Sequence, residues 1–312
     1  MQAFISERAY AKINLGLDVL GRRSDGYHEL RMGMQTVSLA DELTIERSGR
    51  GDGGIELICD RPDLPTDGRN LAYRAAEVFL RHLKITEGVS ISLQKNIPAA
   101  AGLAGGSADA AAVLRGLNRL FEAGLSVEAL RELALPLGAD IPYCVTGGTM
   151  LAEGIGERLT ALPALPGCSI VLVKPEFDLS TASVYGNLHV GELPPEAHPD
   201  MDAVIAALRA GDLKRLGAVM RNILELPAGR EHPEIQEIKD ALTEAGACAV
   251  SMSGSGSAVF GIFEDGQMAE HCPARLREMG FTAAEICLTT PIGACSGPGY
   301  GNSHRTGGKD AG

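Results

Sequence analysis

A glycine- and alanine-rich stretch, PAAAGLAGGSADAA at residues 98–111, constrains the fold of this chain more than any other feature. The preceding segment VSISLQK (89–95) alternates as a strand does, and the following segment has helical spacing, with Ala110, Val113, Leu114, Leu117, Leu120 and Phe121 on one face. Such small side chains build no core, but they leave backbone N–H groups open to close approach. A strand, a glycine turn and a helix N-terminus together favour the binding of an anion such as phosphate.

Two familiar nucleotide-binding fingerprints do not match this loop. A Walker A loop needs a lysine directly after its last glycine, but Gly106 is followed by Ser107 and Ala108. The spacing of Gly102 and Gly105 also differs from the G-x-G-x-x-G of dinucleotide-binding oxidoreductases. If the loop binds phosphate, it does so in another fold. A flexible connection to a capped helix, in which Asp109 favours the first helical turn, is the alternative.

Composition narrows the class of partner. The 312 residues suffice for one large domain or two ordinary ones, and a hydrophobic fraction of 45% allows a full core. The formal charge of −12, from 40 acidic and 28 basic residues, opposes a nucleic-acid or anionic membrane surface. An anionic small molecule would need a local basic pocket.

Cysteine spacing and the N-terminal segment predict a cytoplasmic protein. The seven cysteines are odd in number and form no C-x-x-C pair, which favours thiols in a reducing compartment over disulfides or a zinc site. The start of the chain, MQAFISERAYAK, lacks the basic and apolar regions of a signal peptide. No apolar run approaches the ~20 residues that span a bilayer.

Alternation and capping residues predict an α+β protein. Strands are expected at AYAKINLGLDVLG (9–21), RMGMQTVSL and DELTIER, with an Asp25-Gly26 turn between the first two. Asn70 and Ser126 are expected to cap helices. The Pro/Gly-rich ALPALPG (161–167) predicts a domain boundary. Strands and helices do not alternate strictly, which favours α+β over a doubly wound sheet.

The second half of the chain begins with a buried-looking strand, CSIVLVKP. Helical patterns follow near 200–209, 212–225 and 233–245. Two strands, ACAVSMS and SAVFGIF, then flank a glycine turn, and a helix to Gly280 and the strand AEICLTT complete the order.

Three further segments carry polar groups whose role is open when each is taken alone. In AKINLGL, Lys12 and Asn14 share one face of a strand, either toward a cleft or on an ordinary half-exposed surface. SMSGSGSAVFGIF (251–263) is either a binding loop or a plain hairpin turn. Asp140, in LGADIPYC, is either a catalytic carboxylate or a turn or cap residue.

Taken together, AYAKINLGL, PAAAGLAGGSADAA and SMSGSGSAVFGIF resemble, in order, the three motifs of the GHMP small-molecule kinases. The resemblance runs from about residue 7 to about residue 290. It implies the two-domain GHMP kinase fold: an N-terminal domain (1–160) that carries the ATP loop and resembles a ribosomal-protein domain, and a ferredoxin-like C-terminal domain (168–292). The active site would lie in the cleft between them, and residues 296–312 would form a disordered tail.

DGYHEL, LGADIPYC, LAEGIGERL and the segment 170–185 resemble one branch of that family. That branch uses ATP and Mg²⁺ to phosphorylate the 2-hydroxyl of diphosphocytidyl-methylerythritol in the non-mevalonate isoprenoid pathway. Homoserine and mevalonate kinases share the glycine loop and are the alternative, although they are not expected to carry DGYHEL. A non-catalytic RNA-binding module is a remote alternative that the acidic charge opposes. The expected partners are small molecules, with no nucleic acid and no membrane, and the chain is expected to be a monomer or homodimer.

The resemblance assigns roles to individual residues. Asp140 matches the catalytic base, and Lys12 would stabilise charge beside it and keep it ionised. Asn14 would position that pair or the substrate. The residues that would wrap the ATP phosphates are Pro98, Ala99, Ala100, Ala101, Gly102, Leu103, Ala104, Gly105, Gly106, Ser107 and Ala108.

Other matches concern the acceptor and the metal ion. Tyr27, His28 and Tyr185 match residues that hold a cytosine ring. The loop that would close over the diphosphate consists of Ser253, Gly254, Ser255 and Gly256. The family often has two serines where this chain has Ser107-Ala108, so one hydroxyl is missing and Ser107 alone would serve as the Mg²⁺ ligand.

Overall fold

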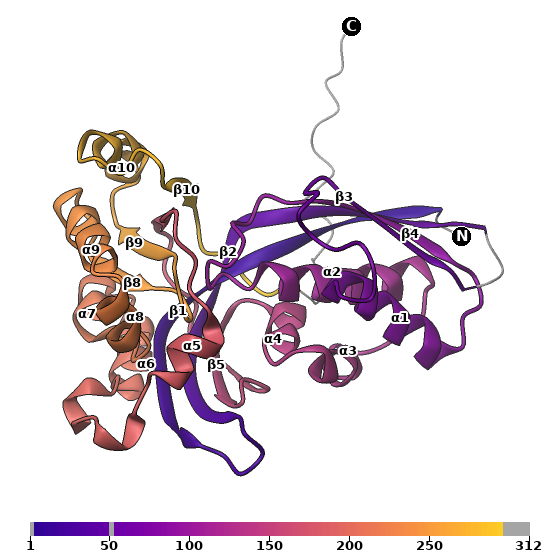
Figure 1. The fold of residues 1–312 in the computed structure, drawn as a ribbon, viewed down its shortest axis with the longest axis horizontal. Coiled ribbons are helices and arrows are strands. Elements are labelled where there is room, and N and C mark those ends of the chain that lie inside the picture. The colour runs from indigo at the N-terminus through magenta and orange to yellow at the C-terminus, as the bar shows by residue number, and fades with distance from the viewer. Residues whose placement is uncertain (1–2, 50–52, 296–312) are drawn as a thin grey trace, which may run out of the picture.

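The computed structural model describes residues 3–49 and 53–295. Its strands form two sheets, each flanked by helices (Figure 1). The larger sheet contains β1 (Phe4–Arg22), β2 (His28–Arg47), β3 (Ile55–Cys59), β4 (Val89–Gln94), β5 (Thr149–Gly154) and β6 (Arg158–Ala161). The smaller sheet contains β7 (Ser169–Lys174), β8 (Ala249–Met252), β9 (Val259–Phe263) and β10 (Glu285–Thr289).

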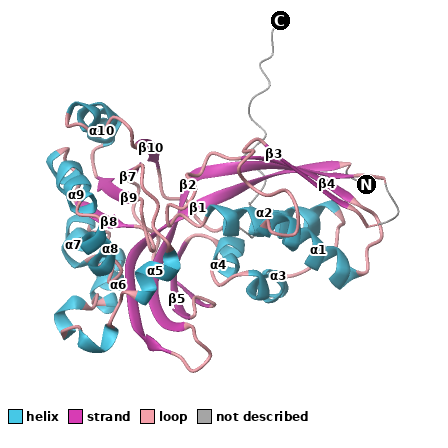
Figure 2. Ribbon diagram, viewed as in Figure 1, coloured by secondary structure: helices cyan, strands magenta, loops and turns pink. Residues whose placement is uncertain are grey.

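Helices cover one side of the larger sheet and flank the smaller one (Figure 2). The first group is α1 (Leu71–Leu83), α2 (Gly105–Leu120), α3 (Val127–Ala134) and α4 (Ile141–Thr146). The second group is α5 (Thr181–Gly186), α6 (Met201–Ala210), α7 (Leu213–Val219), α8 (Glu225–Glu231), α9 (Glu234–Glu244) and α10 (Gly266–Glu278). Short 3-10 helices lie at Leu135–Leu137, Val190–Glu192 and Pro195–Ala197.

The long strand β2 organises the larger sheet. It pairs with β1 along one edge, while β4 and β5 pair with opposite ends of its other edge. The expectation of two separate strands, RMGMQTVSL and DELTIER, is therefore wrong. The polar middle of β2 stays extended because the C-terminal segment satisfies its backbone: Ser38 N donates to Thr290 O, and Leu39 N donates to Thr289 Oγ1.

Both faces of β1 are buried from Ala11 to Val19, whereas exposed and buried residues alternate from Phe4 to Ala9. Ala11 and Ile13 belong to a core cluster with Met201 of α6 and Phe260 of β9, which lie in the second unit, formed by the smaller sheet and its helices. Helix α2 of the larger unit, formed by the larger sheet and its helices, also packs against β1. Lys12 is 4% exposed and Asn14 is 1% exposed. The half-exposed surface considered for AKINLGL is thus excluded, because the second unit covers the strand.

Local capping signals agree with the structure. Asn70 Oδ1 accepts a hydrogen bond from Ala72 N at the start of α1, and Ser126 Oγ accepts one from Ala129 N at the start of α3. An N-cap side chain satisfies an N–H that has no partner inside the helix. Both predicted helix starts are confirmed.

Ser126 offers a test of capping without interference from any binding site, since it lies on an exposed helix end. We expect Ser126→Ala to lower the free energy of unfolding by ~1 kcal/mol, the usual cost of losing an N-cap oxygen. Urea unfolding followed by circular dichroism would measure it. A free energy of unfolding equal to that of the wild type would contradict a capping role for Ser126.

The smaller sheet has the order β10-β7-β9-β8 and is antiparallel throughout. With helices between β7 and β8 and between β9 and β10, this is the β-α-β-β-α-β arrangement of ferredoxin-like domains. The single helix expected over 212–225 is wrong, because α7 ends at Val219 and α8 begins at Glu225. The intervening residues pair with β1 instead: Leu17 N donates to Arg221 O and Ile223 N donates to Leu17 O, both at 3.0 Å.

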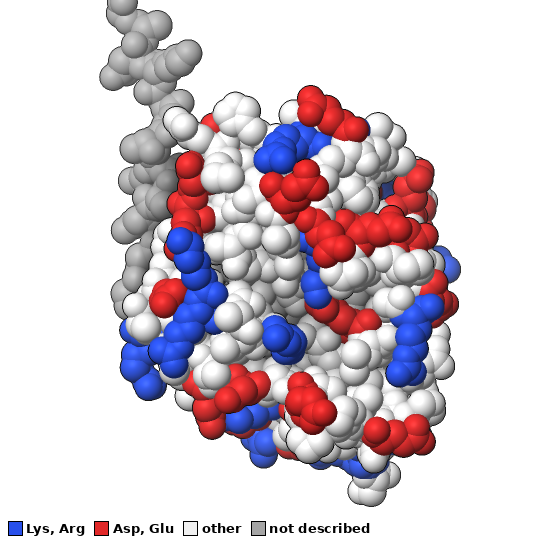
Figure 3. Space-filling view, turned by 90° about the vertical axis from the view of Figure 1, so that its left-hand side faces the viewer, with Lys and Arg blue, Asp and Glu red and all other residues white. Residues whose placement is uncertain are grey.

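The predicted disordered tail, 296–312, lies outside the described residues. Within 3–49 and 53–295, none of the helices combines the length and the apolar character needed to cross a bilayer. On the face shown in Figure 3, Lys and Arg side chains lie interspersed with Asp and Glu.

Candidate active site

A cavity of about 500 Å³ brings together the segments that the sequence motifs single out. The glycine loop forms much of its wall, from Ile97 to Ser107. The other predicted residues that line it are Lys12, Asn14, Asp140, Tyr185, Gly254 and Ser255. Segments from both sheets and their helices therefore line one cavity, and α5 contributes Thr181 and Tyr185 to it.

The N-terminus of α2 opens onto this cavity. Ala104 occupies the N-cap position and has no side-chain oxygen to accept from the first helical N–H groups. Gly105, Gly106 and Ser107, the first residues of α2, all line the cavity. Uncapped N–H groups and the helix dipole favour an anion at this position. Ala108 is buried and is not among the lining residues.

Only glycine fits at position 102, because the loop at 98–108 and the loop at 253–257 approach each other closely there. Its φ is +71°, and a Cβ there would lie 2.0 Å from Ser253 O. Its carbonyl accepts hydrogen bonds from Lys12 Nζ at 2.7 Å and from Ser253 Oγ at 3.0 Å. This glycine thus joins the loop at 98–108 to the loop at 253–257.

Lys12 and Asn14 form the polar floor of the cavity. Lys12 Nζ donates to Asn14 Oδ1 at 2.8 Å, and Asn14 Oδ1 also accepts from Gly254 N at 2.9 Å. Burial lowers the pKa of Lys12, and the negative charge of Asp140 opposes that shift. Within the described residues, Lys12 and Asp140 make no direct ion pair, and neutral oxygens hold the ammonium group.

Asp140 occupies the N-cap position of α4, but its side chain makes no capping hydrogen bond. It lines the cavity instead. The alternative that it is a cap residue is therefore wrong as far as its carboxylate is concerned. A carboxylate that faces the cavity at this position can accept a proton from a bound hydroxyl.

A buried charge cluster behind the loop was missed in the sequence. Lys95 Nζ contacts both Asp41 Oδ2 and Asp109 Oδ2, and Asp41 Oδ1 accepts from Asn96 N and Ile97 N at 2.6 and 2.8 Å. Burial raises the pKa of Asp109 to about 8, although Lys95 opposes the shift. Asp109 therefore belongs to this cluster. The expectation that Asp109 favours the first turn of α2 is wrong, because α2 begins at Gly105 and its first turn contains no acidic residue. No local pattern links 41, 95 and 109, so the sequence carried no signal for the cluster.

Of the three residues expected to hold cytosine, Tyr185 lines the cavity, whereas Tyr27 and His28 do not. The ring centroids of His28 and Tyr185 lie 4.9 Å apart at an angle of 35°, and burial raises the pKa of Tyr185. Tyr27 is 57% exposed on the β1–β2 hairpin, and neither Tyr27 nor His28 lines the cavity.

The loop 253–257 contacts the cavity through its middle. Gly254 and Ser255 line it, and Ser255 Oγ bonds Thr181 Oγ1 of α5 at 2.8 Å. Ser253 is fully buried behind Gly102, and Gly256 does not line the cavity. Thr181 is a further lining residue that the sequence analysis did not single out.

Two family models match the chain: the GHMP kinases N terminal domain over residues 70–148 and the GHMP kinases C terminal domain over residues 204–281. A 4-diphosphocytidyl-2-C-methyl-D-erythritol kinase of Acetivibrio thermocellus is 47% identical over 265 residues, covering 85% of this chain and 92% of the relative. A protein of the same name from Clostridium botulinum is 46% identical over 271 residues, covering 87% and 95%.

Solved structures agree with these matches. The crystal structure of a 4-(cytidine 5'-diphospho)-2C-methyl-D-erythritol kinase superposes with a TM-score of 0.77 at 38% identity, covering 93% of this chain and all of the other. A homoserine kinase from Cytophaga hutchinsonii gives a TM-score of 0.78 at 21% identity, covering 94% and 96%, which shows a shared fold. With two family models, relatives at 46–47% identity and the same arrangement of motifs around one cavity, the chain belongs to the GHMP kinase family.

Proposed function

We propose that this kinase transfers the γ-phosphate of ATP to the 2-hydroxyl of 4-diphosphocytidyl-2-C-methyl-D-erythritol, a step of the non-mevalonate isoprenoid pathway. The observation that carries the proposal is that the N-terminus of α2 lines the same cavity as Lys12, Asp140 and Tyr185. The names of relatives at 46–47% identity support the same acceptor.

The geometry supports a division of labour in phosphoryl transfer. The transferred group needs positioning and charge neutralisation more than covalent help from the protein. The N–H groups at the start of α2 would bind the ATP phosphates, and the Lys12 ammonium would stabilise negative charge that develops on the transferred group. Asp140 would accept the proton of the attacking hydroxyl.

Mg²⁺ is expected to accompany ATP. The described residues contain no group of three or more His, Cys, Asp or Glu side chains that could hold a metal ion. Mg²⁺ commonly binds through substrate phosphates with only one or two protein ligands. Two oxygen atoms fit such a site as metal ligands. One is the Ser107 hydroxyl, which lines the cavity. The other is Asp109 Oδ1, which is buried and has no hydrogen-bond partner. The ion would supply charge neutralisation on the phosphates.

ATP-dependent release of ADP, measured with each candidate acceptor in turn, tests the proposed reaction. We expect turnover with the diphosphocytidyl acceptor and background rates with homoserine and mevalonate. Preference for either of the other alcohols would reject the proposed substrate while leaving the kinase assignment intact.

Other assignments stay predictions. Boundaries at 1–160 and 168–292 are supported by family models that each fall within one range. A cytosolic location and a monomeric or homodimeric state follow only from the sequence arguments. An RNA-binding role would need a basic surface, and the interspersed charges in Figure 3 do not supply one on that face.

Tyr185 tests the cytosine site. We expect Tyr185→Ala to raise the KM for the diphosphocytidyl acceptor by roughly ten-fold or more, because base–aromatic stacking is worth ~1–3 kcal/mol. The KM for ATP should change little. Steady-state titration of both substrates would measure this effect. An unchanged acceptor KM in Tyr185→Ala would remove this ring from the site.

A further inference from the structure

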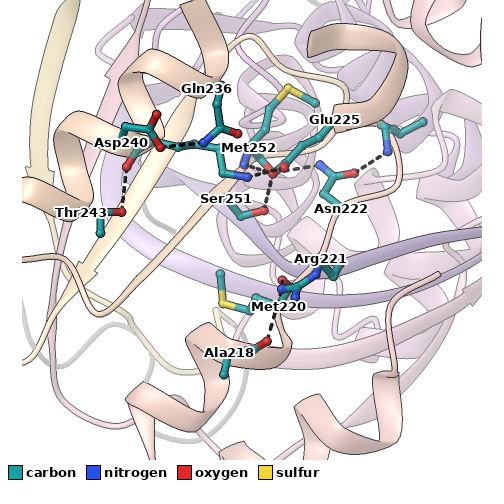
Figure 4. Close-up of polar contacts among 12 residues, drawn as sticks. Ala218, Met220, Arg221, Asn222, Glu225, Gln236, Asp240, Thr243, Ser251 and Met252 are labelled. Carbon is teal, nitrogen blue, oxygen red and sulfur yellow. Dashed lines mark hydrogen bonds and ion pairs between the residues drawn. The ribbon is translucent and has the colours of Figure 1, made fainter. Parts of the chain in front are cut away.

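The break between α7 and α8 delivers one buried side chain to the active-site loop. After Val219 the chain leaves the helix and pairs with Leu17 of β1 through the backbone of Arg221 and Ile223. Asn222, between these two residues, is 4% exposed. Figure 4 shows its amide among Met252, Glu225 and Ser251, at the end of β8.

The Asn222 amide uses both of its donor hydrogens and its oxygen. Nδ2 donates to Met252 O at 2.9 Å and to Gly254 O at 2.8 Å. Oδ1 accepts from Leu224 N at 3.0 Å. An aspartate of the same size could not donate either of the first two bonds. The pattern therefore requires an amide at this position.

The carbonyl of Gly254 is one end of a hydrogen-bonded series that reaches the catalytic lysine. Gly254 N donates to Asn14 Oδ1 at 2.9 Å, and the same oxygen accepts from Lys12 Nζ at 2.8 Å. The φ of Gly254 is +56°, and a Cβ there would lie 3.0 Å from Lys12 Nζ. Any shift of Gly254 would thus disturb Asn14 and Lys12 directly.

Glu225, the first residue of α8, supports the same strand end. Its Oε1 accepts from Met252 N at 2.7 Å and from Ser251 Oγ at 2.8 Å (Figure 4). Its Oε2 binds Lys239 Nζ at 2.5 Å. Side chains three residues apart, Asn222 and Glu225, therefore hold both the C=O and the N–H of Met252. The loop that begins at Ser253 starts from a fixed point.

We propose that Asn222 is a positioning residue for phosphoryl transfer, acting through Gly254 on Asn14 and Lys12. The proposal rests on the proposed function in one respect: Lys12 stabilises negative charge on the transferred phosphate. Asn222 does not line the cavity, so its effect reaches the reaction through the loop.

Replacing Asn222 should slow the reaction more than it weakens nucleotide binding. We expect Asn222→Ala to lower kcat about ten-fold or more, since two hydrogen bonds that hold the loop are lost, while the KM for ATP changes less than three-fold. Asn222→Asp keeps the volume and the acceptor for Leu224 N but loses both donors. It should give a similar loss of kcat and serves as the test if the alanine variant does not fold.

The control is Asn118→Ala. The Asn118 side chain also bonds the backbone: its Nδ2 donates to Leu125 O, and its Oδ1 accepts from Leu125 N. Asn118 does not line the cavity. It should lower the melting temperature and leave kcat unchanged at temperatures where the variant is folded. All assays are run well below each variant's melting temperature.

A double-mutant cycle with Asn14→Ala tests the route of action. If Asn222 acts through Asn14, adding Asn222→Ala to Asn14→Ala should lower kcat less than three-fold further. Equal fold-losses in both backgrounds, or a kcat within two-fold of wild type for a folded Asn222 variant, would overturn the proposal. If wild-type enzyme prefers another alcohol, the proposed acceptor fails separately, and the same cycle is measured with that alcohol.

Discussion

Asp140→Asn is expected to lower kcat by ~10²–10⁴-fold, the usual contribution of a general base, while ATP still binds. The carboxylate lines the cavity and makes no capping bond to α4. Its negative charge opposes the lowering of the Lys12 pKa that burial causes. An asparagine keeps the size of the side chain but cannot take the proton from the acceptor hydroxyl. Steady-state kinetics and calorimetric titration with a nucleotide analogue would separate turnover from binding.

A second N-cap aspartate provides the matched control for that variant. Asp265 accepts hydrogen bonds from Gln267 N and Met268 N at the start of α10, outside the cavity. Asparagine caps helices as well as aspartate does, so Asp265→Asn should retain both stability and kcat. A kcat for Asp140→Asn within ten-fold of wild type would reduce Asp140 to an electrostatic neighbour of Lys12.

Gly106→Val is expected to weaken ATP binding about 100-fold or more without unfolding the protein. Gly106 is exposed at the start of α2, and a Cβ there meets only Leu71 Cδ1, at an ordinary 3.7 Å. Because Gly106 and Leu71 both line the cavity, the added side chain would stand between the helix N-terminus and the phosphates. Hydrogen bonds to charged groups contribute ~1.5–3 kcal/mol each, so losing one or two accounts for the effect.

Gly105 is a poorer choice for the same experiment, since a Cβ there would lie 3.3 Å from Ile97 Cγ2 and disturb the packing behind the loop. Gly229 in α8 supplies the control, because a Cβ there meets no atom within 4 Å. Gly229→Val should leave ATP affinity unchanged. Comparable nucleotide affinity in Gly106→Val and wild type would contradict phosphate binding at this helix end.

Features that depend on neighbours in the chain could be predicted from the sequence. The strand at 89–94, the helix at 105–120 and the caps at Asn70 and Ser126 all follow from periodicity and capping chemistry. The split of 212–225 could not be predicted, because its apolar spacing suits a helix. Pairing with Leu17, some two hundred residues earlier in the chain, decides the break.

The sequence by itself determined the motifs, their order and most of the secondary structure, because turn, cap and alternation signals act over a few residues. Only the tertiary structure decided that Lys12 and Asn14 are buried on a strand covered from both sides, that Lys95 joins Asp41 to Asp109, and that Asn222 holds Gly254. These contacts join residues far apart in the chain. Their energies depend on which elements pack together and on the loss of water around the charged groups, and neither is written in any local stretch of residues.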